Sequence, residues 1–200
     1  MKLVHVKRSA WGIALLSGLC MGSGCKKSTG GSGGGGGNGS GYYMKFKLDG
    51  VQTEYDSEPI AGISYNSSER LYSLVIAAYK DVNAGIKNEV TIIGYSKTTF
   101  AANVPYNDPA KAVENNGSPL PAMTVFYNDP DANGFLTAGE FADAAGNMLI
   151  PGMIANAKLT ITELATGYVK GSFSGTTYKA SDFSKTHAIT EGTFYLQRTQ

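Results

Sequence analysis

Cysteine, histidine and tryptophan are scarce in this chain of 200 residues, and their scarcity excludes several kinds of site. There are two cysteines, Cys20 and Cys25, two histidines, His5 and His187, and a single tryptophan. Cysteine-cluster zinc sites and multi-histidine metal sites are therefore excluded. A Ser-His-Asp triad would have to use His187, and the chain has no G-x-S-x-G segment. We interpret His187 as a surface or strand-end residue and predict that the protein is not an enzyme.

The sequence also lacks an apolar run long enough to span a bilayer as a helix. Residues 10–21 form its longest apolar stretch, which is shorter than the roughly 20 residues that a span needs. A basic segment with Lys2, Lys7 and Arg8 precedes this stretch, and small residues follow it. That order is typical of an export signal, so we predict that residues 1–24 are a signal peptide removed on maturation.

The residues before each cysteine indicate the kind of signal. Cys25 follows Ser23 and Gly24, whereas Cys20 lies inside the apolar stretch. This arrangement resembles the lipobox of bacterial lipoproteins, although Gly22 stands where that motif usually has leucine. The resemblance implies that Cys25 becomes the first residue and carries a diacylglyceryl group with palmitate-type acyl chains. The alternative is an ordinary secretory signal with an incidental cysteine.

The lipoprotein resemblance also implies a location. The residue after Cys25 is Lys26, which differs from the aspartate that retains enterobacterial lipoproteins in the inner membrane. We therefore expect a lipid-anchored protein of the cell outer membrane, facing either the periplasm or the cell surface. Two or more acyl chains are enough for stable anchoring.

Glycine and serine dominate residues 28–41, and such a segment behaves as a flexible linker. We predict that residues 25–41 form the lipidated cysteine with its tether, and that residues 42–200 form one β-rich domain. Removal of residues 1–24 leaves a nearly neutral chain, with a net charge of about −2. No basic field argues for a nucleic-acid partner.

Short segments in which apolar and polar residues alternate, separated by glycine, asparagine and aspartate, predict an all-β fold. The expected strands cover residues 44–48, 71–79, 89–95, 122–127, 157–164, 168–178 and 193–198, and Asp49-Gly50 predicts a hairpin turn. We predict an antiparallel sandwich or barrel of about 8–10 strands. One or two short helices are expected near residues 107–114 and 137–145.

The C-terminal segment carries a further resemblance. Its pattern is LTITEL, then GYVKGSFSGTTY, then HAITEGTFYLQR. It resembles small uncharacterised β-rich lipoproteins of the Bacteroidota, a domain of unknown function. The matching residues are Gly171, Phe173, Gly175, Ile189, Thr190, Gly192 and Phe194. The resemblance implies a β-rich domain at a membrane surface and transfers no catalytic residue.

Residues 129–140 (DPDANGFLTAGE) match the spacing of a calcium-binding loop. The oxygen ligands in that spacing would be Asp129, Asp131, Asn133, the Phe135 carbonyl and Glu140. The segment before the loop has strand chemistry, whereas an EF-hand needs a helix there. A plain polar turn is therefore the favoured alternative, since Asn, Asp and Gly collect in turns for backbone reasons.

These observations predict a membrane-anchored lipoprotein that acts as a non-enzymatic binding or structural module of the cell envelope. Its expected partners are the membrane, through the lipid, and a glycan or an envelope protein. Two alternatives stay open: an envelope hydrolase using paired carboxylates, and a calcium-stabilised adhesion module. Calcium is the one cofactor that the sequence suggests.

Overall fold

The computed structural model describes residues 41–107, 113–115, 118–120, 122–143 and 147–199, so the predicted signal, Cys25 and most of the tether lie outside the described residues. Within these ranges the chain forms strands joined by turns and two short 3-10 helices. The strands are β1 (Tyr43–Leu48), β2 (Val51–Tyr55), β3 (Ser57–Asn66), β4 (Leu71–Tyr79), β5 (Glu89–Ser96), β6 (Pro105–Asn107), β7 (Val113–Asn115), β8 (Ser118–Leu120), β9 (Met123–Asn128), β10 (Gly134–Thr137), β11 (Lys158–Leu164), β12 (Tyr168–Lys179) and β13 (Asp182–Thr199). The predicted all-β fold is confirmed.

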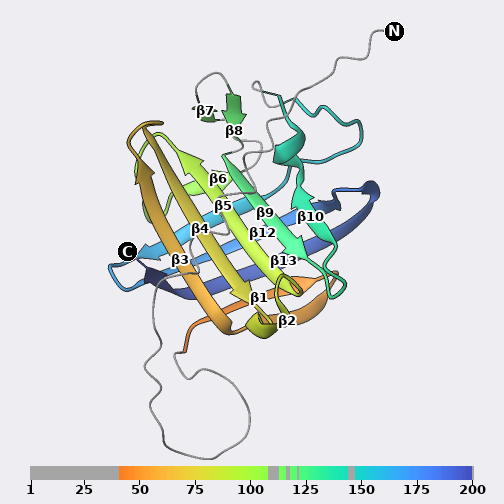
Figure 1. The fold of residues 1–200 in the computed structure, drawn as a ribbon, viewed down its shortest axis with the longest axis horizontal. Helices are drawn as coiled ribbons and strands as arrows, with labels where there is room; N and C mark the ends of the chain where they lie inside the picture. Colours follow the sequence, from red (N-terminus) through yellow and green to blue (C-terminus); the bar gives the residue numbers. More distant parts are fainter. Residues whose placement is uncertain (1–40, 108–112, 116–117, 121, 144–146, 200) are drawn as a thin grey trace, which may run out of the picture. The chain divides into compact units, whose positions relative to one another are not determined.

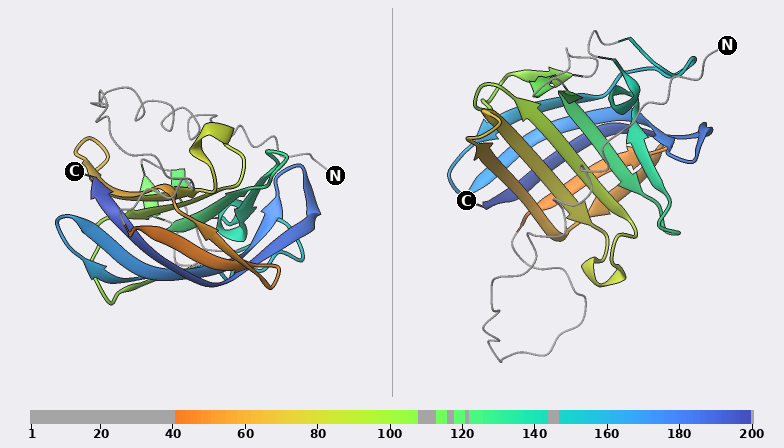
Figure 2. Two further views of the ribbon diagram at one scale, coloured as in Figure 1. Left: turned by 90° about the horizontal axis from the view of Figure 1, so that it is seen from below. Right: turned by 45° about the horizontal axis from the view of Figure 1, so that its top comes forward.

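Eleven of these strands form one sheet, in the order β2-β1-β13-β3-β4-β5-β9-β10-β12-β11-β6 (Figure 1). Strand β13 also pairs with β12, so the sheet closes on itself. The prediction left a sandwich and a barrel open. The observed strand order is that of a closed sheet, as in the barrel alternative. The left view of Figure 2 shows the two sides of this closure, with β1, β2, β12 and β13 along the lower side and β3, β4, β5 and β9 along the upper side. Strands β7 and β8 pair separately.

Strand β13 is 18 residues long and holds the closure together. It pairs antiparallel with β12 along one edge and with β1 along the other. Its last residues, Gln197–Thr199, pair in parallel with Ile60–Gly62 of β3. The sequence predicted only residues 193–198 of this strand, because its first half is exposed and polar.

The β1–β2 hairpin turns where the sequence predicted. Asp49 and Gly50 both have positive φ, 49° and 83°. Asparagine, aspartate and glycine tolerate this conformation, which a two-residue hairpin turn of type I′ requires. The turn also brings Asp49 to β13, where its backbone N–H donates to the Ala188 carbonyl at 2.9 Å.

The interior of the closed sheet is filled by one apolar cluster. Alternate residues of each strand point inward, as in β1, where Met44 and Phe46 are fully buried. The Phe46 ring lies edge-on to Tyr55 at 5.1 Å and tilted against Phe173 at 5.9 Å between centroids. These contacts hold the β1–β2 hairpin against β12.

Two glycines in this interior lie directly beneath phenylalanine rings. Gly171 of β12 faces Phe194 of β13, and Gly192 of β13 faces Phe173 of β12. A Cβ atom on Gly171 would lie 2.4 Å from Phe194 Cζ, and one on Gly192 would lie 2.7 Å from Phe173 Cδ1. Each ring therefore occupies the space that a side chain on the facing residue would need.

The predicted helices are only partly observed. Residues 137–145 contain the 3-10 helix η3 (Ala138–Phe141), while η2 (Val82–Ala84) was not predicted. Near 107–114 the described flanks belong to β6 and β7, and residues 108–112 lie outside the described part of the chain. The described residues form more strands than the predicted 8–10, because they include additional short strands.

No helix in the described ranges has the length and apolar character needed to cross a membrane.

Candidate functional site

The turn at residues 129–133 is built around the Asp129 carboxylate. Its Oδ1 accepts the backbone N–H groups of Asp131 at 2.9 Å and Asn133 at 2.8 Å. Its Oδ2 accepts from the Asn133 side-chain amide at 2.7 Å. Ala132 adopts a φ of 62°, which closes the turn. The first half of the predicted calcium loop is thus a hydrogen-bonded turn between β9 and β10.

The second half of that loop runs away from Asp129. Residues 134–137 form β10, in which Phe135 pairs with Tyr127 of β9. Glu140 then accepts a hydrogen bond from Thr124 Oγ1 at 2.9 Å. Thr124 precedes Asp129 by five residues on an extended strand, so Glu140 lies roughly 17 Å along the hairpin from the turn.

The structure therefore brings Asp129, Asp131 and Asn133 into one turn and does not bring Phe135 or Glu140 to them. Among the described residues, no three His, Cys, Asp or Glu side chains gather closely enough to hold a metal ion. This geometry favours the plain turn over the twelve-residue calcium loop. Strand β10 occupies the positions at which a calcium loop would curve back toward its first ligand.

Burial acts to raise the pKa of the Asp129 carboxyl, but the hydrogen bonds from Asn133 and Asp131 outweigh it and hold that pKa below its ordinary value of 3.8. A carboxyl whose pKa is lowered on folding stabilises the native state above its unfolded pKa. That stabilisation is lost as the pH falls through the folded pKa.

We predict that Asp129→Ala lowers the free energy of unfolding by about 1–2 kcal/mol at neutral pH, because it removes three hydrogen bonds that close the turn. The difference from the wild type should shrink as the pH falls below 3.8 and on through the lowered pKa of the folded carboxyl. Urea denaturation across a pH series measures both effects.

Asp131→Ala is the matched control, because the structure uses only the backbone of this exposed residue. It should change stability by less than about 0.5 kcal/mol.

The melting temperature of the wild-type protein should respond equally to millimolar calcium and magnesium. A rise specific to calcium that disappears in both variants and in Glu140→Gln would instead support the calcium loop.

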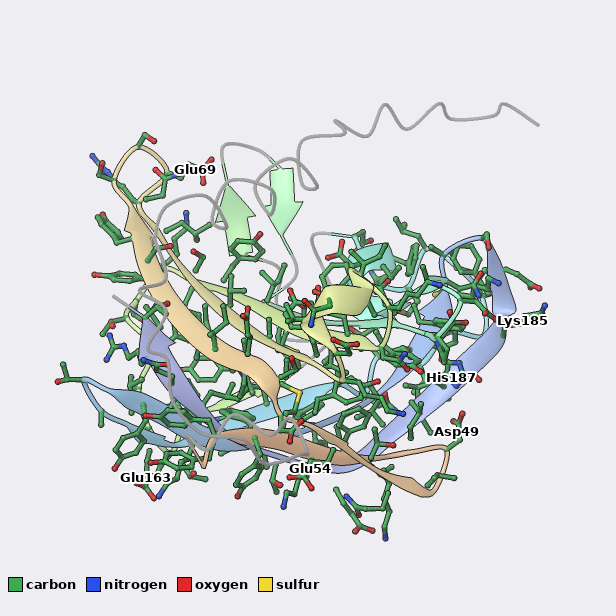
Figure 3. All side chains as sticks on the ribbon, turned by 60° about the horizontal axis from the view of Figure 1, so that its bottom comes forward. Asp49, Glu54, Glu69, Glu163, Lys185 and His187 are labelled. Carbon is green, nitrogen blue, oxygen red and sulfur yellow. The ribbon has the colours of Figure 1, made fainter. Side chains whose placement is uncertain are left out.

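A second polar cluster joins the β1–β2 turn to β13. His187 Nδ1 lies 2.6 Å from Asp49 Oδ2, and Asp49 Oδ1 accepts the Ala188 backbone N–H at 2.8 Å. Burial raises the pKa of Asp49, but these partners outweigh it and the net shift is downward. Figure 3 shows both residues at the same end of the domain.

Aromatic rings enclose the inner side of this pair. The His187 ring packs against Phe135 at 4.4 Å and edge-on to Tyr127 at 5.3 Å. Burial and the nearby carboxylates raise the pKa of Tyr127 to about 12, and burial also raises the pKa of Tyr55. Both phenols are therefore neutral at physiological pH.

An Asp-His pair is part of a catalytic triad only when a nucleophile lies within hydrogen-bond reach. Among the described residues, no serine or threonine hydroxyl is hydrogen-bonded to the His187 ring. The pair ties the hairpin turn to β13 across 138 residues of sequence. His187 lies within β13, and sequence reasoning missed its partner because nothing local links it to Asp49.

One described carboxylate is buried. Glu89 begins β5 and is 7 % exposed. Its two oxygens accept hydrogen bonds from Thr91 Oγ1 at 2.6 Å and from the Asn128 side-chain amide at 3.1 Å. Such a carboxylate cross-links β5 and β9, as buried polar groups normally do when they are paired.

The fourth cluster lies on the outer face of the closed sheet, and we call Tyr42, Tyr43, Tyr168 and Tyr195 the tyrosine cluster. Tyr195 is its centre, with ring centroids 4.9 Å from Tyr42, 6.4 Å from Tyr43 and 5.4 Å from Tyr168. No local pattern groups these tyrosines, because β1 is distant in sequence from β12 and β13.

Comparison of the chain with protein-family models, with curated proteins and with solved structures gave no match. The described residues define an all-β domain whose closed sheet is antiparallel except where the end of β13 pairs in parallel with β3.

Proposed function

We propose that this chain is a lipid-anchored protein of the bacterial cell envelope, and that its β domain acts as a non-enzymatic binding or structural module. The order of a basic segment, an apolar stretch, small residues and Cys25 is the observation that carries the proposal. The glycine-rich tether then leads directly into β1, which begins at Tyr43.

The chemistry of the described clusters is in keeping with a module of this kind. The carboxylates of Asp49, Glu89 and Asp129 each accept hydrogen bonds that join strands or close a turn. Carboxylates that are hydrogen-bonded in this way stabilise the β domain, which then serves as a rigid support for a binding surface. We propose the outer membrane as the location, on the basis of Lys26 after the lipidated cysteine.

Metabolic labelling with an alkyne palmitate analogue in a Gram-negative host tests the anchor. The wild-type chain should take up the label and sediment with outer membranes. Cys25→Ser should lose the label almost completely and move to the soluble fraction, because the thiol that receives the lipid is gone.

Cys20→Ser is the matched control, since it lies in the predicted signal and should leave labelling unchanged. Label that survives in Cys25→Ser but is lost in Cys20→Ser would move the anchor to Cys20. Secretion of an unlabelled wild-type chain would contradict the lipoprotein proposal and favour an ordinary secretory signal.

A further inference from the structure

The tyrosine cluster lies on three neighbouring strands, β1, β13 and β12, and the row of register partners that crosses it continues to β11. Tyr43 of β1 is the register partner of Tyr195 in β13, and Tyr195 is the partner of Lys170 in β12. Lys170 in turn faces Glu163 of β11. These residues alternate with buried ones such as Phe194 and Leu196, so the row lies on the outer face of the sheet.

Two ammonium groups lie over the rings of this row. Lys45 Nζ is 4.7 Å from the centroid of Tyr43. Lys170 Nζ lies 5.1 Å from the centroid of Tyr195 and 5.3 Å from that of Tyr168. Each lysine also has an acidic partner, since Lys45 pairs with Glu54 at 3.1 Å and Lys170 with Glu163 at 3.0 Å.

This geometry discriminates between ligands. A sugar ring stacks on the open face of an aromatic side chain, but the lysines lie over three of the rings, and the tyrosine pairs are edge-on rather than coplanar. The cluster instead combines amphipathic rings with flexible ammonium groups. Tyrosine is enriched at membrane–water interfaces, and lysine keeps its ammonium at headgroup level.

The position of the cluster in the chain also favours a membrane surface as its ligand. Tyr42 follows the predicted tether directly and lies only 17 residues after Cys25. A glycine-rich chain of that length has a root-mean-square reach of roughly 20–25 Å. The cluster therefore contains the point at which the domain is attached to its anchor.

The opposite side of the domain is distant from this attachment point. Glu54 and Glu163, which flank the cluster, lie along the lower side of the domain in Figure 3. Glu69, in the turn between β3 and β4, lies at the upper side in the same view. The tether thus begins on the side of the domain that carries the cluster.

We propose that the tyrosine cluster docks the domain on the phospholipid headgroups of the membrane that holds its anchor. This inference rests on the proposed lipid anchoring at Cys25. The tyrosine rings insert among the headgroups, and Lys45 and Lys170 reach phosphate oxygens. Because Glu54 and Glu163 balance the two lysines, docking requires no anionic lipid and depends little on salt.

A tryptophan reporter tests this docking. Trp11 is the single tryptophan of the chain and lies in the predicted signal, so the mature protein has none. The lipidated protein carrying Tyr195→Trp is reconstituted on phosphatidylcholine vesicles whose acyl chains are brominated. Docking should shift the tryptophan emission to shorter wavelength and quench it at least twofold relative to unbrominated vesicles.

Tyr65→Trp is the matched control on β3. Tyr65 is 52 % exposed and, like Tyr195, packs against another tyrosine, with its ring centroid 4.6 Å from that of Tyr72. Its emission should stay red-shifted and unquenched on the same vesicles. Tyr168→Trp is a second reporter within the cluster should Tyr195→Trp fail to fold.

The outcomes separate the docking from the anchor. Vesicle-bound protein whose cluster reporters are no more quenched than Tyr65→Trp would overturn the docking and leave the anchor in place. Lipid-labelled protein that fails to remain on vesicles would contradict the anchor itself. Emission from the cluster reporters that responds to soluble oligosaccharides but not to vesicles would reassign the cluster to a glycan.

Discussion

Gly171→Ala should lower the free energy of unfolding of the mature protein by about 3 kcal/mol, because the interior of the closed sheet has no room for the added methyl group. A Cβ atom at this position would lie 2.3 Å from the Thr160 carbonyl oxygen and 2.4 Å from Phe194 Cζ. Neither neighbour is free to move, since Thr160 pairs with Ser172 in the ladder and Phe194 is buried. Urea denaturation of the unlipidated Cys25→Ser chain measures the loss.

Gly167→Ala provides the control, because a Cβ atom there meets no atom within 4 Å. This substitution in the turn between β11 and β12 should change stability by less than about 0.5 kcal/mol. Equal losses in the two variants would mean that a general response to replacing glycine, rather than the contacts of Gly171, determines the effect.

The Gly171 contact gives a physical reason for the C-terminal sequence pattern. Gly171 and Gly192 alternate with Phe173 and Phe194 so that each glycine faces a phenylalanine on the neighbouring strand. A ring that lies over a glycine covers its backbone and fills the space of the missing side chain. The pattern is therefore a packing motif of the β12–β13 hairpin.

Much of the fold could be predicted because several strands carry a local signal. Alternation and β-branched residues predicted β4, β5, β9, β11 and β12 within about two residues of their observed ends. Strand β3 was missed, since Pro59 and Gly62 interrupt its pattern. The sequence left the choice between a sandwich and a barrel open, because the pairing of β3 with the end of β13 joins residues 137 positions apart, and no local pattern encodes it.

The candidate sites illustrate the same limit. The turn at Asp129 was visible in the sequence because its hydrogen bonds are local. The calcium interpretation depended on Glu140 returning to that turn, and the short strand β10 prevents this. Pairs such as Asp49 with His187 depend on strand order alone, so only the structure could reveal them.

Phe194→Ala should lower the free energy of unfolding by about 3–5 kcal/mol, which makes it the most damaging single change that we predict. The ring is 2 % exposed and lies over Gly171, with Phe173 at 6.3 Å between centroids. Its removal exposes apolar surface and leaves a cavity between β12 and β13. Thermal and urea denaturation of the same unlipidated chain measure the change.

The double variant Gly171→Ala with Phe194→Ala then tests whether the two residues are coupled. Removing the Phe194 ring eliminates one of the two close approaches to a Cβ atom at position 171, and the Thr160 carbonyl oxygen at 2.3 Å remains. The free energy of unfolding of the double variant should therefore exceed the value expected from the sum of the two single losses by about 1 kcal/mol. Gly171→Ala should still destabilise the Phe194→Ala chain. Strict additivity would contradict the observed packing of the ring over the glycine.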